Sequence, residues 1–157
     1  MRALIVDDEP LARDELERLL LETGAFSIVG LCGDALQALQ IMRAERPDVL
    51  FLDIQMPGVT GFELLGMMDE DLTPDVVFVT AHEGFAVKAF EESAVDYLLK
   101  PIDMGRLAKT VERLRRRRSE GTRPTYLAPG ITRVPCLAAR SIKLVPVQDV
   151  ELSLIHI

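Results

Sequence analysis

Short, uninterrupted apolar runs alternate along most of the chain with longer segments whose apolar residues recur every three or four positions. Uninterrupted runs are typical of strands buried on both faces, and the longer spacing is typical of amphipathic helices. The predicted strands are residues 3–6, 26–32, 48–53, 75–80 and 94–99, and the predicted helices are residues 10–23, 35–46, 61–68, 84–92 and 103–118. Five strand–helix repeats predict an α/β fold, a doubly wound parallel sheet with helices on both faces.

Capping signals support several of these helix starts. Pro10 falls where a first helical turn accepts proline, with Asp8 or Glu9 as the expected cap. Asp34 and Thr60 each precede a glutamine or glutamate by three residues, which is the spacing of a capping box. The helix boundaries therefore rest on local chemistry as well as on apolar spacing.

Polar residues stand where four of the predicted strands end. Asp7 and Asp8 follow the first strand, Asp53 ends the third, Thr80 ends the fourth and Lys100 follows the fifth. In the flavodoxin-like strand order 2-1-3-4-5, the first and third strands are neighbours, and ligands bind beyond their carboxyl ends. With this order, one edge of the sheet is expected to hold a compact ionic site.

The residue types at this edge suit phosphoryl chemistry. Clustered carboxylates are unfavourable unless a cation neutralises them, and oxygen ligands without histidine or cysteine favour Mg²⁺. Asp53, at the end of the central strand, is placed to be a nucleophile toward a phosphoryl group. Lys100 and Thr80 can bind phosphoryl oxygens by charge and by hydrogen bonding.

Each of these residues, taken alone, is also compatible with a structural role. Asp8 could cap the first helix, and Asp53 could be a turn residue before the "MPG" segment. Thr80 could only begin a helix, and Lys100 could be a solvated strand end. Their joint position at the ends of successive strands favours a shared site.

Four motifs, in order across residues 1–118, resemble the receiver domain of two-component response regulators: "LIVDDEPLAR", "LFLDIQMPGVTGFELL", "FVTAHEGFAVKAF" and "AVDYLLKPID". The resemblance implies that Asp53 accepts a phosphoryl group from a sensor histidine kinase. It further implies that Asp8 and Asp53 bind Mg²⁺ directly, that Asp7 acts through water, and that the backbone carbonyl of Gln55 is another ligand.

The same resemblance assigns the residues around the acidic cluster. Thr80 and Tyr97 are similar to the switch pair of the family, and Lys100 to its phosphate-contacting lysine. The Lys100–Pro101 bond is expected to be cis, as is common in the family and accessible to an X–Pro bond. Phosphorylation is expected to draw Thr80 toward the phosphoryl group and to let Tyr97 turn inward.

The stretch "TAHEGFAVKAFEESAVDYLLKPID" is similar to regulators with a LytTR-type DNA-binding domain, and the tail "RVPCLAARSIKLVPVQDVE" resembles the opening strands of that domain. This resemblance divides the chain into three parts. Residues 1–118 would be the receiver, residues 119–130 a linker rich in Gly, Pro, Ser and Thr, and residues 131–157 the truncated start of that mostly-β domain. Two or three short strands are expected there, with a turn near 138–141. The final "LSLIHI" departs from the family and suggests a truncation or a fused end, so this fragment is not expected to bind promoter DNA specifically.

The expected output is a homodimer formed on phosphorylation, which would place two complete DNA-binding domains on promoter DNA. The face predicted to change comprises the helix at 84–92, the strand at 94–99 and the final helix. Its mixed charges are carried by Lys88, Glu91, Glu92, Asp96, Arg106 and Lys109.

Composition narrows the alternatives. The 157 residues are 48% hydrophobic with a net charge of −7, which argues against electrostatic nucleic-acid binding by the whole chain. The run Arg115–Arg118 is therefore predicted to be a solvated helix end. Cys32 and Cys136 are expected to be buried, reduced thiols. No apolar stretch approaches the ~20 residues of a membrane span, no signal peptide is evident, and a cytoplasmic location is expected.

Two other functions compete with the transcriptional switch. A stand-alone receiver would pass on phosphoryl groups or dock a protein partner, but it would not need the linker and new strands after Gly130. An Mg²⁺-dependent phosphohydrolase of the haloacid dehalogenase type would carry D-x-D after its first strand and large cap insertions. Here Asp7 and Asp8 are adjacent and the loops are short, so the chain is not expected to be an enzyme.

Overall fold

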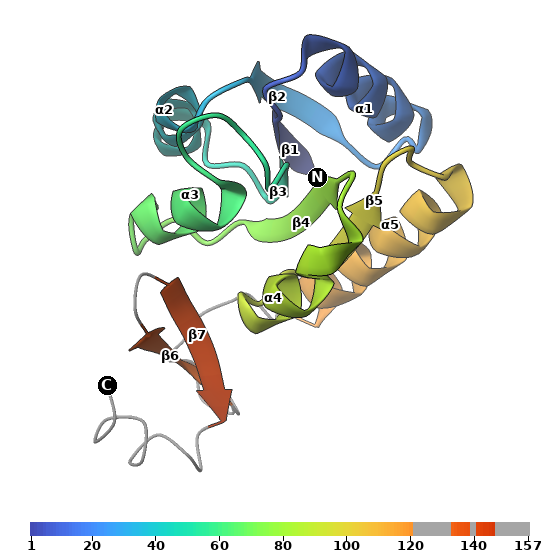
Figure 1. The fold of residues 1–157 in the computed structure, drawn as a ribbon. Coiled ribbons are helices and arrows are strands. Elements are labelled where there is room, and N and C mark those ends of the chain that lie inside the picture. The colour runs from blue at the N-terminus through green and yellow to red at the C-terminus, as the bar shows by residue number, and fades with distance from the viewer. Residues whose placement is uncertain (121–132, 139–140, 147–157) are drawn as a thin grey trace.

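The computed structural model of the chain describes residues 1–120 and two later strands, residues 133–138 and 141–146. Five parallel strands form one sheet in the order β2–β1–β3–β4–β5 (Figure 1). They are β1 (Arg2–Val6), β2 (Ser27–Cys32), β3 (Val49–Leu52), β4 (Asp75–Thr80) and β5 (Asp96–Leu99). The flavodoxin-like class and strand order predicted from the sequence are therefore confirmed.

Helices connect successive strands. They are α1 (Pro10–Glu22), α2 (Ala35–Glu45), α3 (Gly61–Met67), α4 (Ala86–Glu91) and α5 (Met104–Ser119). The helix expected at 84–92 is shorter, because a 3₁₀ turn, η1 (Glu83–Phe85), precedes α4. Gly84 lies in this turn, and glycine is a poor former of regular α-helix.

The capping predictions are confirmed for two helices and wrong for one. Asp34 accepts a hydrogen bond from the backbone N–H of Gln37 (2.8 Å), and Thr60 caps α3 in the same way. At α1, however, no side chain caps the helix, although Pro10 stands in the first turn as predicted. The carboxylate of Asp7 instead accepts from the N–H of Glu9 (2.9 Å). The acidic loop before α1 is therefore held by a turn of its own.

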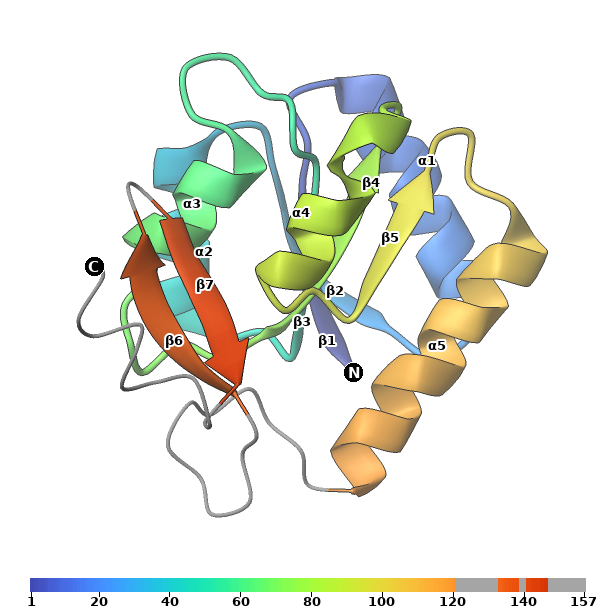
Figure 2. The same ribbon diagram turned by 60° about the horizontal axis from the view of Figure 1, so that its bottom comes forward.

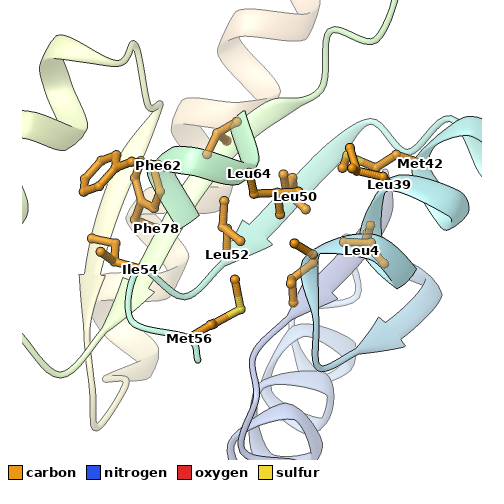
Figure 3. Packing of buried hydrophobic residues seen from close by; sticks show 14 of the residues in the cluster. Leu4, Leu39, Met42, Leu50, Leu52, Ile54, Met56, Phe62, Leu64 and Phe78 are labelled. Atoms are coloured by element: carbon orange, nitrogen blue, oxygen red, sulfur yellow. The ribbon is translucent and has the colours of Figure 1, made fainter. Parts of the chain in front are cut away.

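Helices cover both faces of the sheet, α1 and α5 on one side and α2, α3 and α4 on the other (Figure 2). Alternate residues of each strand divide between the two layers: Leu4 and Val6 face α2–α4, while Ala3 and Ile5 face α1 and α5. Figure 3 shows the α2–α4 layer, built mainly from leucine, methionine and phenylalanine side chains. Burial on both faces explains why these strands are apolar without alternation.

Beyond the sheet, β6 (Arg133–Ala138) and β7 (Ser141–Pro146) pair antiparallel, with Ala138 opposite Ser141. Two of the expected short strands are therefore present, and residues 139–140, in the predicted turn, lie outside the described residues. Most of the proposed linker and the "LSLIHI" end lie outside the described residues. Among the described helices, none combines the length and apolar character that a membrane span requires.

Candidate functional site

Three aspartates converge at the carboxyl edge of the sheet. Because Val6 of β1 pairs with Leu52 of β3, Asp7 and Asp53 leave neighbouring strands at the same level. Both side chains are buried, at 5% and 7% exposure, and Asp8 is half-buried. One carboxylate oxygen from each of the three lies within 4.8 Å of the others. The convergence predicted from the strand ends is present.

Lys100 joins this cluster from the end of β5. Its Nζ lies 2.6 Å from Asp7 Oδ2 and 3.3 Å from Asp53 Oδ2. The Lys100–Pro101 bond is cis, as expected. Within residues 1–120, the Asp8 carboxylate has no ion pair or side-chain hydrogen bond, so one ammonium group faces three carboxylates.

The electrostatics of the cluster reflect this imbalance. Burial raises the pKa of Asp53, Lys100 opposes that rise, and the neighbouring Asp7 carboxylate adds to it. Burial alone would lower the pKa of Lys100, but its hydrogen bond to Asp7 and the charges of both aspartates raise it. Lys100 is thus held as a cation, while ionised Asp53 is costly without further positive charge.

The donor set fits a hard divalent cation. Carboxylate oxygens are the ligands that Mg²⁺ prefers, and an excess of negative charge favours its binding. Gln55 follows closely, since its N–H donates to Asp53 Oδ1 at 3.3 Å. The residues predicted as ligands therefore lie together at one edge of the sheet.

Thr80 and Tyr97 are linked through the backbone of one residue, His82. Thr80 is fully buried, and its Oγ1 accepts a hydrogen bond from the N–H of His82 (3.4 Å). The Tyr97 hydroxyl donates to the carbonyl of His82, and its ring packs in the core on the α4 side. Burial raises the pKa of Tyr97. The Tyr97 ring is thus buried in the chain without a phosphoryl group, and its predicted inward turn on phosphorylation stays a prediction.

Two close backbone approaches were not foreseen from the sequence. A Cβ on Gly61 would lie 2.5 Å from the carbonyl oxygen of Asp53, so a side chain there would force the loop after β3 away from α3. Arg13 of α1 donates from Nη1 to the carbonyl oxygen of Asp7 (2.6 Å), beside Gly33. The available signals were the glycine that opens α3 and the arginine that ends "DDEPLAR".

Asp96, predicted to contribute to the mixed charge of the dimer face, does not lie at the surface. Its side chain is fully buried and accepts hydrogen bonds from Arg106 (2.8 Å and 2.5 Å), Arg113 (3.0 Å) and Thr110 (2.7 Å), and from the N–H of Tyr97 (2.9 Å). Burial would raise the pKa of Asp96, but these hydrogen bonds lower it overall. Asp96 therefore ties β5 to α5.

In the arginine run, Arg115, Arg116 and Arg118 are exposed as predicted, whereas Arg117 is half-buried. Arg117 lies 3.3 Å from Asp75, at the start of β4, and Arg118 lies 3.3 Å from Asp48, just before β3. The end of α5 is thus fastened to the amino edge of the sheet.

Cys32 is buried, as expected for a structural cysteine. Burial raises the pKa of its thiol to about 12, so it stays protonated at neutral pH. The side chain of Cys136 lies outside the described residues.

Comparison with known proteins identifies the family of the domain that carries this site. Residues 3–112 match the family described as response regulator receiver domain. The transcriptional regulatory protein BtsR of Escherichia coli K12 is 47% identical over 154 residues, and an uncharacterized response regulatory protein of Vibrio cholerae is 45% identical over 151. Each match covers 96% of this chain and 64% of the relative, so the chain spans less than two-thirds of these proteins' length.

Solved structures give the same result. The response regulatory domain of mrkE from Klebsiella pneumoniae matches with a TM-score of 0.67 and 35% identity, over 76% of this chain and 99% of that one. TrrA of Thermotoga maritima, solved in complex with Mg²⁺ and BeF, matches with a TM-score of 0.63 and 29% identity, over 72% and 97% of the two chains. The chain belongs to the response regulator receiver domain family.

Proposed function

We propose that this chain is the receiver part of a transcription regulator and that Asp53 accepts a phosphoryl group from a sensor histidine kinase. The observation that carries the proposal is the convergence of three carboxylates at the ends of β1 and β3, two of which, Asp7 and Asp53, pair with Lys100 from the end of β5. Receiver domains as a family are phosphorylated by such kinases. The acidic edge has the parts that this reaction requires.

In the proposed transfer, a carboxylate oxygen of Asp53 bonds to phosphorus while the bond from phosphorus to the donor's imidazole nitrogen breaks. The electron pair of the broken bond stays on that nitrogen, and an acyl phosphate forms on Asp53. Lys100 is 3.3 Å from Asp53, where its ammonium can bind a phosphoryl oxygen, and Thr80 can donate a hydrogen bond to another.

We assign Mg²⁺ to Asp8 and Asp53, with the Gln55 carbonyl as a further ligand and Asp7 acting through water. When bound, the ion supplies positive charge that offsets the charge on the phosphoryl oxygens. The unpaired carboxylate of Asp8 and the charge excess of the cluster support this assignment. Asp7 is already engaged by Lys100 at 2.6 Å, which suits a less direct role.

Phosphorylation would shift a two-state equilibrium in the chain. Thr80 and Tyr97 both bond to the backbone of His82, so movement of Thr80 toward a phosphoryl group would alter the loop that Tyr97 contacts. The affected face includes the exposed apolar side chains of Val87 and Phe90. We assign homodimerisation to this face, and sedimentation with and without BeF and Mg²⁺ tests it. An unchanged mass at high protein concentration would contradict it.

We divide the chain into a receiver (1–118), a linker (119–130) and the start of a LytTR-type DNA-binding domain (131–157). The antiparallel pairing of β6 with β7 and the greater length of the curated relatives support this division. In the complete regulator, that domain would contact promoter DNA.

The test of phosphoryl transfer is intact-protein mass spectrometry after incubation with acetyl phosphate and Mg²⁺. One acid-stable phosphoryl adduct is expected on the unmodified sequence and none on Asp53→Asn. Asp69→Asn, which alters an exposed aspartate paired with Arg43, is the matched control and should be phosphorylated normally. An equal adduct on Asp53→Asn would overturn the assignment, and sustained phosphate release over many turnovers would favour a phosphohydrolase.

A further inference from the structure

Arg13 reaches the acidic cluster from the first turns of α1 without contacting any of its carboxylates. Its Nη1 lies 2.6 Å from the backbone carbonyl oxygen of Asp7, and its own backbone N–H donates to Glu9 (3.1 Å). Among the described side chains, no ion pair joins Arg13 to an acidic group. The guanidinium therefore donates to a peptide carbonyl, although three carboxylates lie nearby.

The carbonyl that Arg13 holds belongs to the peptide joining Asp7 to Asp8. Because this peptide is planar, its oxygen cannot be fixed without also fixing the direction of the Cα of Asp8. The remaining groups of Asp7 are held independently, since its N–H donates to Cys32 (3.0 Å) and its Oδ1 accepts from Glu9. The hydrogen bond from Arg13 is thus the contact that sets how Asp8 leaves the strand end.

Gly33, just after β2, makes room for this arrangement. A Cβ built there would lie 2.9 Å from Arg13 Nη1 and 3.7 Å from both the Asp7 carbonyl oxygen and the Asp8 Cα. The guanidinium therefore occupies the space that a side chain at position 33 would take. Any residue larger than glycine would push the end of Arg13 away from the Asp7 carbonyl.

We propose that Arg13 is a positioning residue for the divalent cation: it orients the Asp7–Asp8 peptide so that the Asp8 carboxylate points into the site. The inference rests on the proposed Mg²⁺ site and adds to it the group that orients a ligand. Partners that orient metal ligands commonly change affinity by about tenfold or more when removed.

The charge of Arg13 has the opposite effect on the metal. A guanidinium near the site repels a divalent cation, so a purely electrostatic role would make Mg²⁺ bind more tightly once Arg13 is removed. A positioning role makes Mg²⁺ bind more weakly after the same change. The sign of the change in affinity separates the two roles.

Calorimetric titration with Mg²⁺ tests the inference on three variants. Arg13→Gln should raise the Mg²⁺ Kd by about tenfold. Gly33→Ala keeps the charge but displaces the guanidinium, and it should raise Kd in the same direction. Arg18→Gln is the matched control: it removes an arginine from the same helix, one that pairs with Glu22 at the surface (2.7 Å), and it should leave Kd unchanged.

A second readout excludes a general loss of structure. With acetyl phosphate as donor, the half-saturating Mg²⁺ concentration should rise in Arg13→Gln, while the rate at saturating Mg²⁺ stays close to that of the unmodified chain. An unchanged or lower Kd in both Arg13→Gln and Gly33→Ala would overturn the inference while leaving the Mg²⁺ site intact. If the unmodified chain itself bound no Mg²⁺, the proposed site would fail together with the inference.

Discussion

The two edges of the same sheet bury aspartates in different surroundings. At the carboxyl edge, Asp7 and Asp53 both pair with Lys100, and among the described residues the neighbouring Asp8 carboxylate has no ion pair. Burial and the neighbouring aspartate raise the pKa of Asp53 in spite of that lysine. The negative charge there is only partly balanced by the protein.

At the amino edge, the acids meet the arginines of α5. Asp96 accepts hydrogen bonds from two guanidinium groups, a hydroxyl and an N–H, and these bonds lower its pKa although burial opposes them. Asp75 has a more distant partner in Arg117 (3.3 Å), and burial raises its pKa. The supply of donors, rather than the residue type, distinguishes a structural aspartate from one left to bind a cation.

The largest expected effect comes from removing the charge of Asp96, whose carboxylate accepts several hydrogen bonds at the amino edge. Asp96→Asn should lower the free energy of unfolding by about 3 kcal/mol, because it leaves Arg106 and Arg113 without their charged acceptor. Urea denaturation without divalent cations measures this change. The control Asp69→Asn, at an exposed pair, should change the same quantity by less than about 1 kcal/mol. An equally small change for Asp96→Asn would show that the buried cluster contributes little to stability.

The same variant has a defined pH dependence. Because the folded pKa of Asp96 lies below its unfolded value of about 3.9, its contribution is present above that pH and is lost as pH falls through the folded pKa. The stability difference between the unmodified chain and Asp96→Asn should therefore be constant from about pH 5 to 7 and shrink below about pH 4. A difference that persists at lower pH would mean that packing, not charge, is responsible.

The next effect separates the two edges by their response to Mg²⁺. At ten times its Kd, Mg²⁺ should raise the free energy of unfolding by about 1.4 kcal/mol, because it binds only the folded chain. Asp8→Asn should lose this increment, whereas Asp96→Asn should keep it. Thermal melts in MgCl₂ and in NaCl of equal ionic strength measure the difference. An increment that survives Asp8→Asn would place the ion elsewhere.

A smaller effect, of opposite sign, is expected from Asp53→Asn without divalent cations. A raised pKa in the folded chain means that the ionised carboxylate of Asp53 is less favourable there than in the unfolded chain. Removing this charge should therefore stabilise the folded chain at pH 7. The free energy of unfolding should rise by on the order of 1 kcal/mol. Urea denaturation in chelator tests this, and a loss of stability would mean that the pairing of Asp53 with Lys100 outweighs its burial.

The residues at the carboxyl edge could be predicted because each lies at the end of a strand, and the strand order fixes where the strands end. Parallel strands in a known order bring their ends to one edge, so Asp7, Asp53, Thr80 and Lys100 follow from apolar patterning and strand order. No side-chain rotamer had to be known to bring these positions together. Their individual roles still depend on the proposed chemistry.

The remaining contacts depend on how helices pack on the sheet. The burial of Asp96 does not follow from the sequence, because periodicity does not show that α5 brings Arg106, Thr110 and Arg113 over it. The hydrogen bond from Arg13 to the Asp7 carbonyl cannot be recognised from the sequence, because every residue type has a backbone carbonyl. Such contacts depend on packing angles and side-chain reach, which periodicity does not specify.

The smallest expected effect comes from the exposed ion pair between Arg118, at the end of α5, and Asp48. Arg118 and Asp48 are 3.3 Å apart with side chains 42% and 28% exposed, so water competes for both. Arg118→Gln should lower the free energy of unfolding by about 0.5 kcal/mol or less. Asp48 also accepts from the N–H of Arg2 (2.8 Å), so a double-mutant cycle with Asp48→Asn is needed to isolate the pair. If the coupling energy of Arg118 with Asp48 were close to that of Arg106 with Asp96, burial would not determine the strength of the ion pairs at the amino edge. The arginines of α5 would then act as one unit.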